Sequence, residues 1–292
     1  MRSSRNAGRW ILAGTLCVTT AGLATPVLAA RKLETSDRPY WRTNLFKRVF
    51  IDQKYLVTRW WPRELEDPSF ATPLGASLAV AIASGSQAGG GWDLTLESGI
   101  SGGVGSGVKS ASHVLTAIGD APAAAAILGI AYLSSRRAHH DRFSEATSLA
   151  AESLADAGIW NVVLKSVTAR VRPGNPDASR FFQYGARESN SFPSGHAMGA
   201  FSVASVFAEL YRDKKWVPWL SYGLATLIGG SRLALGRHFP SDMVVGALLG
   251  ASIGRGVVAR GGKETTRAGL QLGPVVGPAG RGVGVGWHYS WK

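Results

Sequence analysis

The segment SRLALGRHFPSDM, residues 231–243, places charged and imidazole side chains between two apolar runs of the chain. Arg232, Arg237 and His238 stand close together, and Asp242 follows His238 by four residues. An anion-binding site with an oriented histidine needs this composition, because guanidinium groups bind anions and a carboxylate can hold one imidazole nitrogen. A solvated loop can have the same composition by accident, so the choice between a loop and a site depends on the other segments of the chain.

Two earlier segments supply groups of the same kind. Residues 193–196 read Pro-Ser-Gly-His at the predicted start of a helix, where free backbone N–H groups favour an anion. Gly195 lets the backbone approach that anion closely. Lys165 and Arg172 are seven residues apart, so we expect them to share one face of a helix. Unpaired charges in apolar surroundings are costly, and a shared anion would explain all of them.

The order and spacing of these groups resemble the signature of the type 2 phosphatidic acid phosphatase (PAP2) superfamily, which is K-x6-RP, PSGH and SR-x5-H-x3-D. In this chain the motifs run from Lys165 to Pro173, from Pro193 to His196, and from Ser231 to Asp242, with every fixed position filled. The resemblance implies a mainly α fold, a PAP2-like helical bundle. Arg237 is not a fixed position of the signature.

The residues indicate a metal-independent phosphatase for phosphate or diphosphate esters. We expect the phosphate charge to be offset by Lys165, Arg172, Ser194, Gly195 and Arg232. Neutral His238 then attacks phosphorus to give a phosphohistidine, and Asp242 orients its imidazole. His196 protonates the leaving oxygen and afterwards activates water. The family assigns the same roles, and neither a metal nor another cofactor is required.

Two alternative functions use the same pocket. The family also includes vanadium-dependent haloperoxidases, which hold vanadate there, and a broad-specificity soluble acid phosphatase would hold phosphate. Apolar residues beside the motifs favour a phosphorylated lipid over a small soluble phosphoester. Trp60 and Trp61, with Arg59 and Arg63, either make peripheral contact with a membrane or pack the N-terminal segment onto the domain.

The 292 residues are 45% hydrophobic with a mean hydropathy of +0.04, so a sizeable core can be buried. Residues 111–262 form the predicted helical catalytic domain. Its uncharged runs are shorter than a bilayer requires, so we expect buried core helices and no transmembrane bundle. Residues 31–110 are an N-terminal extension with helical segments and Gly-rich stretches, and we expect the Gly-rich stretches to be loops.

Both ends of the chain differ from the catalytic domain. Residues 1–30 read as a signal peptide, with three arginines before a long uncharged stretch and small residues at its end. An uncleaved membrane anchor is the alternative, because the stretch is long enough to span a bilayer. The protein is therefore predicted to be exported, to the periplasm or the outer face of the membrane. Residues 263–292 predict a C-terminal β-hairpin, because apolar residues alternate in GVGVGWHYSW.

The charge balance favours anionic partners. Removal of residues 1–30 takes three arginines and no acids, which lowers the net charge from +13 to +10. A basic protein attracts phosphorylated substrates, anionic lipid or nucleic acid. The chain has no nucleic-acid-binding module and no stripe of closely spaced basic residues, so we expect no nucleic-acid partner.

Overall fold

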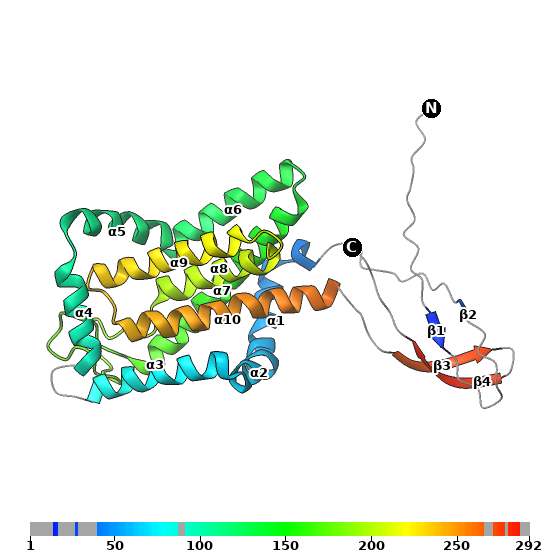
Figure 1. Ribbon diagram of the computed structural model, residues 1–292, viewed down its shortest axis with the longest axis horizontal. Helices are drawn as coiled ribbons and strands as arrows, with labels where there is room; N and C mark the ends of the chain where they lie inside the picture. The colour runs from blue at the N-terminus through cyan, green and yellow to red at the C-terminus, as the bar shows by residue number, and fades with distance from the viewer. Residues whose placement is uncertain are drawn as a thin grey trace. The chain divides into compact units, whose positions relative to one another are not determined.

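The computed structural model describes residues 40–86 and 91–265, together with four short strands elsewhere in the chain. Residues Trp41–Arg260 form one compact unit, and Met1–Tyr40 group with Gly261–Lys292 in another. The secondary-structure elements of the compact unit are all helices, which confirms the mainly α prediction (Figure 1).

The first part of the compact unit lies outside the signature motifs. Its elements are the 3-10 helix η1 (Tyr40–Arg42), α1 (Leu45–Tyr55), the π-helical segment η2 (Leu56–Trp60), α2 (Trp61–Glu66), α3 (Pro68–Ser86), α4 (Gly91–Gly103), α5 (Ser106–Gly119) and α6 (Ala121–Arg137). Trp60 donates from Nε1 to Ser252 Oγ at 3.0 Å, and the Trp61 ring meets that of Trp160 edge-on at 4.6 Å. The two tryptophans therefore pack this segment onto the domain.

The expectation of Gly-rich loops is wrong for residues 99–108. Helix α4 continues to Gly103 and α5 begins at Ser106, so glycines lie inside both helices. Asp93, Glu97 and Ser112 of these helices are buried, and Asp93 accepts a hydrogen bond from the Ser241 N–H at 3.1 Å. Tertiary packing of this kind overrides the low helix propensity of glycine. Residues 87–90 lie outside the described residues.

Four helices carry the motifs: α7 (Asp141–Thr168), α8 (Gly195–Leu210), α9 (Trp216–Ala234) and α10 (Pro240–Thr265). Helix α8 packs against both α7 and α9, and the four run side by side in Figure 1. Gly246, Gly250 and Gly254 bring α10 against the backbone of α8. A Cβ atom on Gly250 would lie 2.1 Å from the Met198 carbonyl oxygen, so no side chain fits there.

A buried ion-pair network joins α1 to α7 and α10. Glu152 Oε2 lies 3.0 Å from Arg48 Nη1, and Glu152 Oε1 lies 2.8 Å from Arg260 Nη2. Arg260 also pairs with Asp52. These four side chains are almost completely buried, so the N-terminal segment is held to the bundle by charges that water does not screen.

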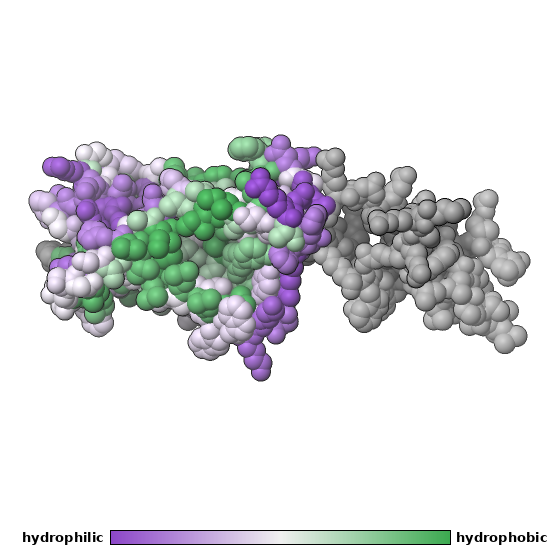
Figure 2. Space-filling view, turned by 90° about the horizontal axis from the view of Figure 1, so that it is seen from above, coloured by the Kyte–Doolittle hydropathy of each residue, from purple (hydrophilic) through white to green (hydrophobic). Residues whose placement is uncertain are grey.

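The expectation that the helices are buried in a core is wrong for their outer faces. Figure 2 shows a broad hydrophobic band between two hydrophilic regions of the compact unit. Large apolar side chains are exposed on α5, α6 and α9, namely Val108, Val114, Ile118, Ile127, Ile130, Leu133, Trp216, Trp219, Leu220, Leu224 and Leu227. A count of the charges along each run does not reveal which face of a helix they occupy.

Two helices, Pro68–Ser86 and Pro240–Gly261, are long and apolar enough to cross a membrane. The pair α5 and α6, bent by 61°, would make a third span if both helices act together. This count rests on length and composition, and it contradicts the expectation that the uncharged runs are too short.

Outside the compact unit, the structure describes strands only by their backbone. Strands β3 (Gln271–Gly277) and β4 (Gly280–Gly286) pair antiparallel, with Leu272 opposite Val285. Strand β1 (Gly14–Leu16) lies between β4 and β2 (Val27–Leu28) in the strand order. Residues 287–292, which carry half of the predicted alternation, lie outside the described residues, and the signal peptide stays a prediction.

Candidate active site

The three motifs meet at one end of the four-helix group. Lys165 lies in the last turn of α7 and Arg232 in the last turn of α9. Ser194 is the N-cap of α8, and His238 lies two residues before α10. Two hydrogen bonds to backbone carbonyl oxygens join these segments. The Ser194 N–H donates to the Asp242 carbonyl oxygen at 3.0 Å, and Arg172 Nη1 donates to the Arg237 carbonyl oxygen at 3.1 Å.

The predicted shared helix face of Lys165 and Arg172 is wrong. Helix α7 ends at Thr168, and Ala169 has a left-handed conformation with φ of 40°, so Arg172 lies in the following loop. The two cations instead share Asn190. Lys165 Nζ donates to its carbonyl oxygen at 2.7 Å, and Arg172 Nε donates to its Oδ1 at 2.7 Å.

The His238 imidazole is buried and directed by Asp242. Its Nδ1 lies 3.4 Å from Asp242 Oδ2, and the same oxygen accepts a hydrogen bond from the Phe239 N–H at 3.0 Å. Burial lowers the pKa of His238 to about 4, although the nearby carboxylate of Asp242 opposes this. At neutral pH the imidazole is therefore uncharged, with Nε2 as the nitrogen that does not face Asp242.

Three buried polar atoms of the motifs have no hydrogen-bond partner in the described part of the chain: Ser194 Oγ, His196 Nε2 and Arg232 Nε. Buried polar groups almost always have partners, so this grouping calls for an explanation. Burial, with Arg232 second, lowers the pKa of His196 to about 4. A tetrahedral anion would accept from these donors and reverse that shift.

Gly195 has a steric role that fits its place in the motif. A Cβ atom on Gly195 would lie 2.8 Å from Asn161 Oδ1. Asn161 is in turn held by its own donor, since Nδ2 lies 3.1 Å from the Pro193 carbonyl oxygen. A side chain at position 195 would therefore push Asn161 away from the start of α8.

Sequence reasoning missed the residues that support the site from behind. Arg170 is fully buried and contacts Asp242, and Asp93 and Ser191 are buried beside the same pair. Asn190, which holds both Lys165 and Arg172, was also missed. The available signal for Arg170 was its place between two motif cations in one short segment.

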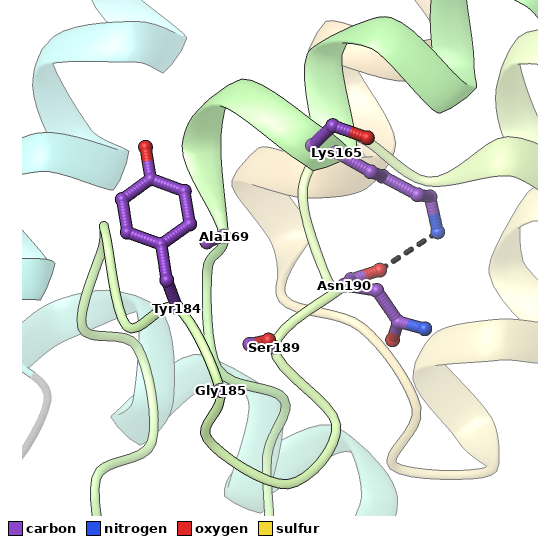
Figure 3. Close-up of a pocket in the computed structure, with 7 residues that line it drawn as sticks. Lys165, Ala169, Tyr184, Gly185, Ser189 and Asn190 are labelled. Carbon is purple, nitrogen blue, oxygen red and sulfur yellow. Dashed lines mark hydrogen bonds between the residues drawn. The ribbon is translucent and has the colours of Figure 1, made fainter.

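A surface pocket of about 260 Å³ opens beside Lys165 (Figure 3). It lies between the end of α7 and the loop that leads to α8, and its lining is Lys165, Ser166, Ala169, Tyr184, Gly185, Ser189 and Asn190. Figure 3 shows Lys165 reaching across to the Asn190 carbonyl oxygen. Tyr184 and its neighbour Phe182 are exposed, so aromatic surface stands near this polar hollow.

The fold and the site define a helical bundle with cationic side chains and two histidines at one end. The PAP2 superfamily model matches residues 146–265 of this chain. A transmembrane PAP2-type phosphatidylglycerolphosphate phosphatase from Bacillus subtilis has a similar fold, with a TM-score of 0.52 and 23% identity. That likeness covers 69% of this chain and 99% of the other.

Two curated relatives are similar to about a third of this chain. Phosphatidylglycerophosphatase B of Bacillus subtilis is 39% identical over 100 residues, which are 32% of this chain and 46% of the relative. Lipid A 4'-phosphatase of Bacteroides thetaiotaomicron is 34% identical over 95 residues, 31% of this chain and 42% of the relative. The chain thus spans under half the length of these curated relatives.

Proposed function

We propose that this chain is a metal-independent phosphatase that hydrolyses phosphate or diphosphate esters of lipids through a phosphohistidine. The observation that carries the proposal is the grouping of Ser194 Oγ, His196 Nε2 and Arg232 Nε, which are buried without partners. Lys165 and Arg172 stand at the same end of the bundle, so the site has the positive charge that a phosphate group requires.

The reaction has two steps with balanced bonds. The His238 Nε2 lone pair attacks phosphorus as the ester P–O bond breaks, and His196 gives its proton to the leaving oxygen. The imidazole gains a positive charge, which Asp242 stabilises from Nδ1. Water then attacks phosphorus, His196 takes the water proton, and the P–N bond breaks to release phosphate and neutral His238.

Three features support a lipid substrate. Large apolar side chains cover the outer faces of α5, α6 and α9, and α3 and α10 are apolar enough to lie in a bilayer. The curated relatives bear the names of lipid phosphatases. Phe182 and Tyr184 add exposed aromatic surface beside the pocket, where acyl or prenyl chains would lie.

We further propose that the protein is exported and works at the periplasm or the outer face of the membrane. The predicted signal peptide of residues 1–30 supports this, with a basic start and an uncharged stretch. Intact cells should therefore hydrolyse a membrane-impermeant phosphate ester. Activity that appears only after the cells are broken contradicts this location.

The test of the function is a phosphate-release screen with a trapping experiment. Purified full-length protein in detergent is assayed with a long-chain phosphatidate, a polyprenyl diphosphate and p-nitrophenyl phosphate. Brief reaction with a substrate labelled in the phosphate should leave acid-labile label on the wild type and none on His238→Ala. Full turnover by His238→Ala overturns the mechanism, and bromide peroxidation with added vanadate in place of phosphatase activity overturns the function.

The preference for a lipid substrate is tested by comparing a variant near the pocket with a control variant on α1. Phe182→Ser should lower kcat/KM for the long-chain lipid and leave that for p-nitrophenyl phosphate unchanged. Phe50→Ser removes an exposed ring from α1, away from the site, and should change neither. If p-nitrophenyl phosphate is the better substrate and Phe182→Ser is silent on both, the enzyme is a broad-specificity phosphatase.

A further inference from the structure

Arg170 is completely buried beneath the site, and each of its five N–H groups has an acceptor. Nη1 donates to Asp242 Oδ1 at 2.6 Å and to Ser241 Oγ at 2.9 Å. Nη2 donates to Asp93 Oδ2 at 2.8 Å and to Ser179 Oγ at 2.9 Å, and Nε donates to the Ser179 carbonyl oxygen at 3.2 Å. The guanidinium is therefore fixed between two carboxylates.

Two aromatic rings cover the faces of this guanidinium. Its central carbon lies 4.9 Å from the ring centre of Phe181 and 4.3 Å from that of Phe239. These contacts favour a cation and keep water away from it. Charge–charge interactions along this path are therefore weakly screened.

The two oxygens of Asp242 have different partners. Oδ1 faces Arg170, whereas Oδ2 faces His238 Nδ1 at 3.4 Å and accepts from the Phe239 N–H and the Ser191 hydroxyl. Because the first oxygen is held by a fixed cation, the carboxylate cannot rotate without breaking a buried ion pair. The second oxygen is thereby held toward the imidazole.

Asp93 is the second carboxylate that contacts Arg170, and it comes from a part of the chain outside the PAP2 match. It lies on α4, is fully buried, and accepts from the Ser241 N–H at 3.1 Å in addition to Arg170. Charges thus alternate in sign from Asp93 through Arg170 and Asp242. A positive His238 would continue the alternation.

We propose that Asp93 and Arg170 are positioning residues that control the proposed nucleophile His238 through Asp242. This inference rests on the proposed function. Phosphorylation places a positive charge on the imidazole, which the negative charge of Asp93 favours and the positive charge of Arg170 opposes. The pair thereby holds Asp242 in place without changing the summed charge next to the imidazole, because its two charges cancel.

The two residues should therefore have opposite effects on the pH profile. Asp93→Asn removes a negative charge, disfavours protonated His238, and should move the acid limb of kcat/KM to lower pH. Arg170→Met removes a positive charge and should move that limb to higher pH. Both should lower kcat by about 10- to 100-fold with little change in KM, as loss of an outer partner of a catalytic group does.

The experiment compares both single variants, the double variant and an exposed control pair across pH with one lipid phosphate in mixed micelles. The substrate's own ionisation is common to all and cancels. The control is Asp177→Asn with Arg180→Met, a solvent-exposed ion pair at 3.0 Å in the same loop, which should leave the limb in place. The double variant should have its limb closer to the wild type than either single variant.

Shifts in the same direction for both single variants, or shifts no larger than the control, overturn the proposal. Arg170→Lys keeps the charge but cannot hold both carboxylates, so its acid limb should stay while kcat falls. If the acid limb of Arg170→Lys moves as far as that of Arg170→Met, the proposal is also overturned. The thermal midpoint of each variant checks folding. The proposed function fails separately, if wild type traps no phosphate or His238→Ala turns over.

Discussion

The Nδ1 atom of His238 lies 3.4 Å from Oδ2 of Asp242, which follows it by four residues across the start of α10. Pro240 opens the helix between them, so the imidazole stands just outside the helix and the carboxylate lies in its first turn. This local geometry orients one nitrogen of the ring and leaves the other to react.

Substitution of His238 should lower turnover more than substitution of Asp242. His238→Ala removes the attacking atom and should abolish phosphate release, with the thermal midpoint unchanged within a few degrees. Asp242→Asn keeps the shape but loses the charge that stabilises the phosphorylated ring, and should lower kcat by about 10²- to 10⁴-fold. A larger loss in Asp242→Asn than in His238→Ala contradicts these roles.

His196→Ala should separate the two chemical steps. An aryl phosphate with a good leaving group needs no proton, so the variant should still form the phosphohistidine. Hydrolysis of that intermediate lacks its base and should become slow. Rapid-mixing measurements should then show a burst of one aryl alcohol per enzyme followed by slow turnover, and a burst-free variant that traps no label contradicts the assignment.

The pH dependence follows from the states that the two histidines must adopt. His238 must be neutral, and its pKa is lowered to about 4, so kcat/KM should rise as pH increases through that value. His196 must be protonated in the complex, where the bound dianion raises its lowered pKa. With a poor leaving group kcat should therefore fall at alkaline pH, and an alkaline limb that survives in His196→Ala argues against this role.

Vanadate should inhibit phosphatase activity, whereas a metal chelator should not. Vanadate adopts the five-coordinate geometry of the transition state and should inhibit through the same cations. Arg172→Gln should weaken that inhibition, because one bidentate donor is lost. EDTA should not reduce activity. A loss of activity in EDTA that a divalent ion restores would contradict the metal-free mechanism.

The ion-pair network at the other end of the bundle should govern stability. Arg260→Leu leaves Asp52 and Glu152 without that cation in a buried place, and should lower the free energy of unfolding by about 3–5 kcal/mol. Burial, with Glu152 and Asp156 nearby, raises the pKa of Asp52, so Asp52→Asn should cost less. Denaturant unfolding followed by circular dichroism compares the two, and equal losses contradict the argument.

The motifs could be predicted from the sequence because their chemistry is carried by residue type and spacing. Ser194 at a helix start and Asp242 in the first turn after His238 follow from cap and turn preferences, and the structure has both. The position of Arg172 could not be predicted from its spacing to Lys165, because the left-handed Ala169 ends the helix between them.

Contacts between residues far apart in the sequence, and the exposure of helix faces, cannot be predicted from short sequence patterns. Asp93 stands 149 residues before Asp242 and meets the site through Arg170 and Ser241, so no spacing rule connects them. The outer apolar faces were missed for a related reason. Arg232 interrupts an apolar run but turns toward the site, and the remaining side chains of α9 can still face lipid.

The glycines of α10 let this helix pack against α8 backbone to backbone, at Gly246, Gly250 and Gly254. His196 lies in the first turn of α8, and His238 lies two residues before α10. The spacing of the two helices is therefore set by main-chain atoms, whose dimensions do not change with side-chain rotamers. One added methyl group on Gly250 would push the helices apart and would move the two histidines relative to each other.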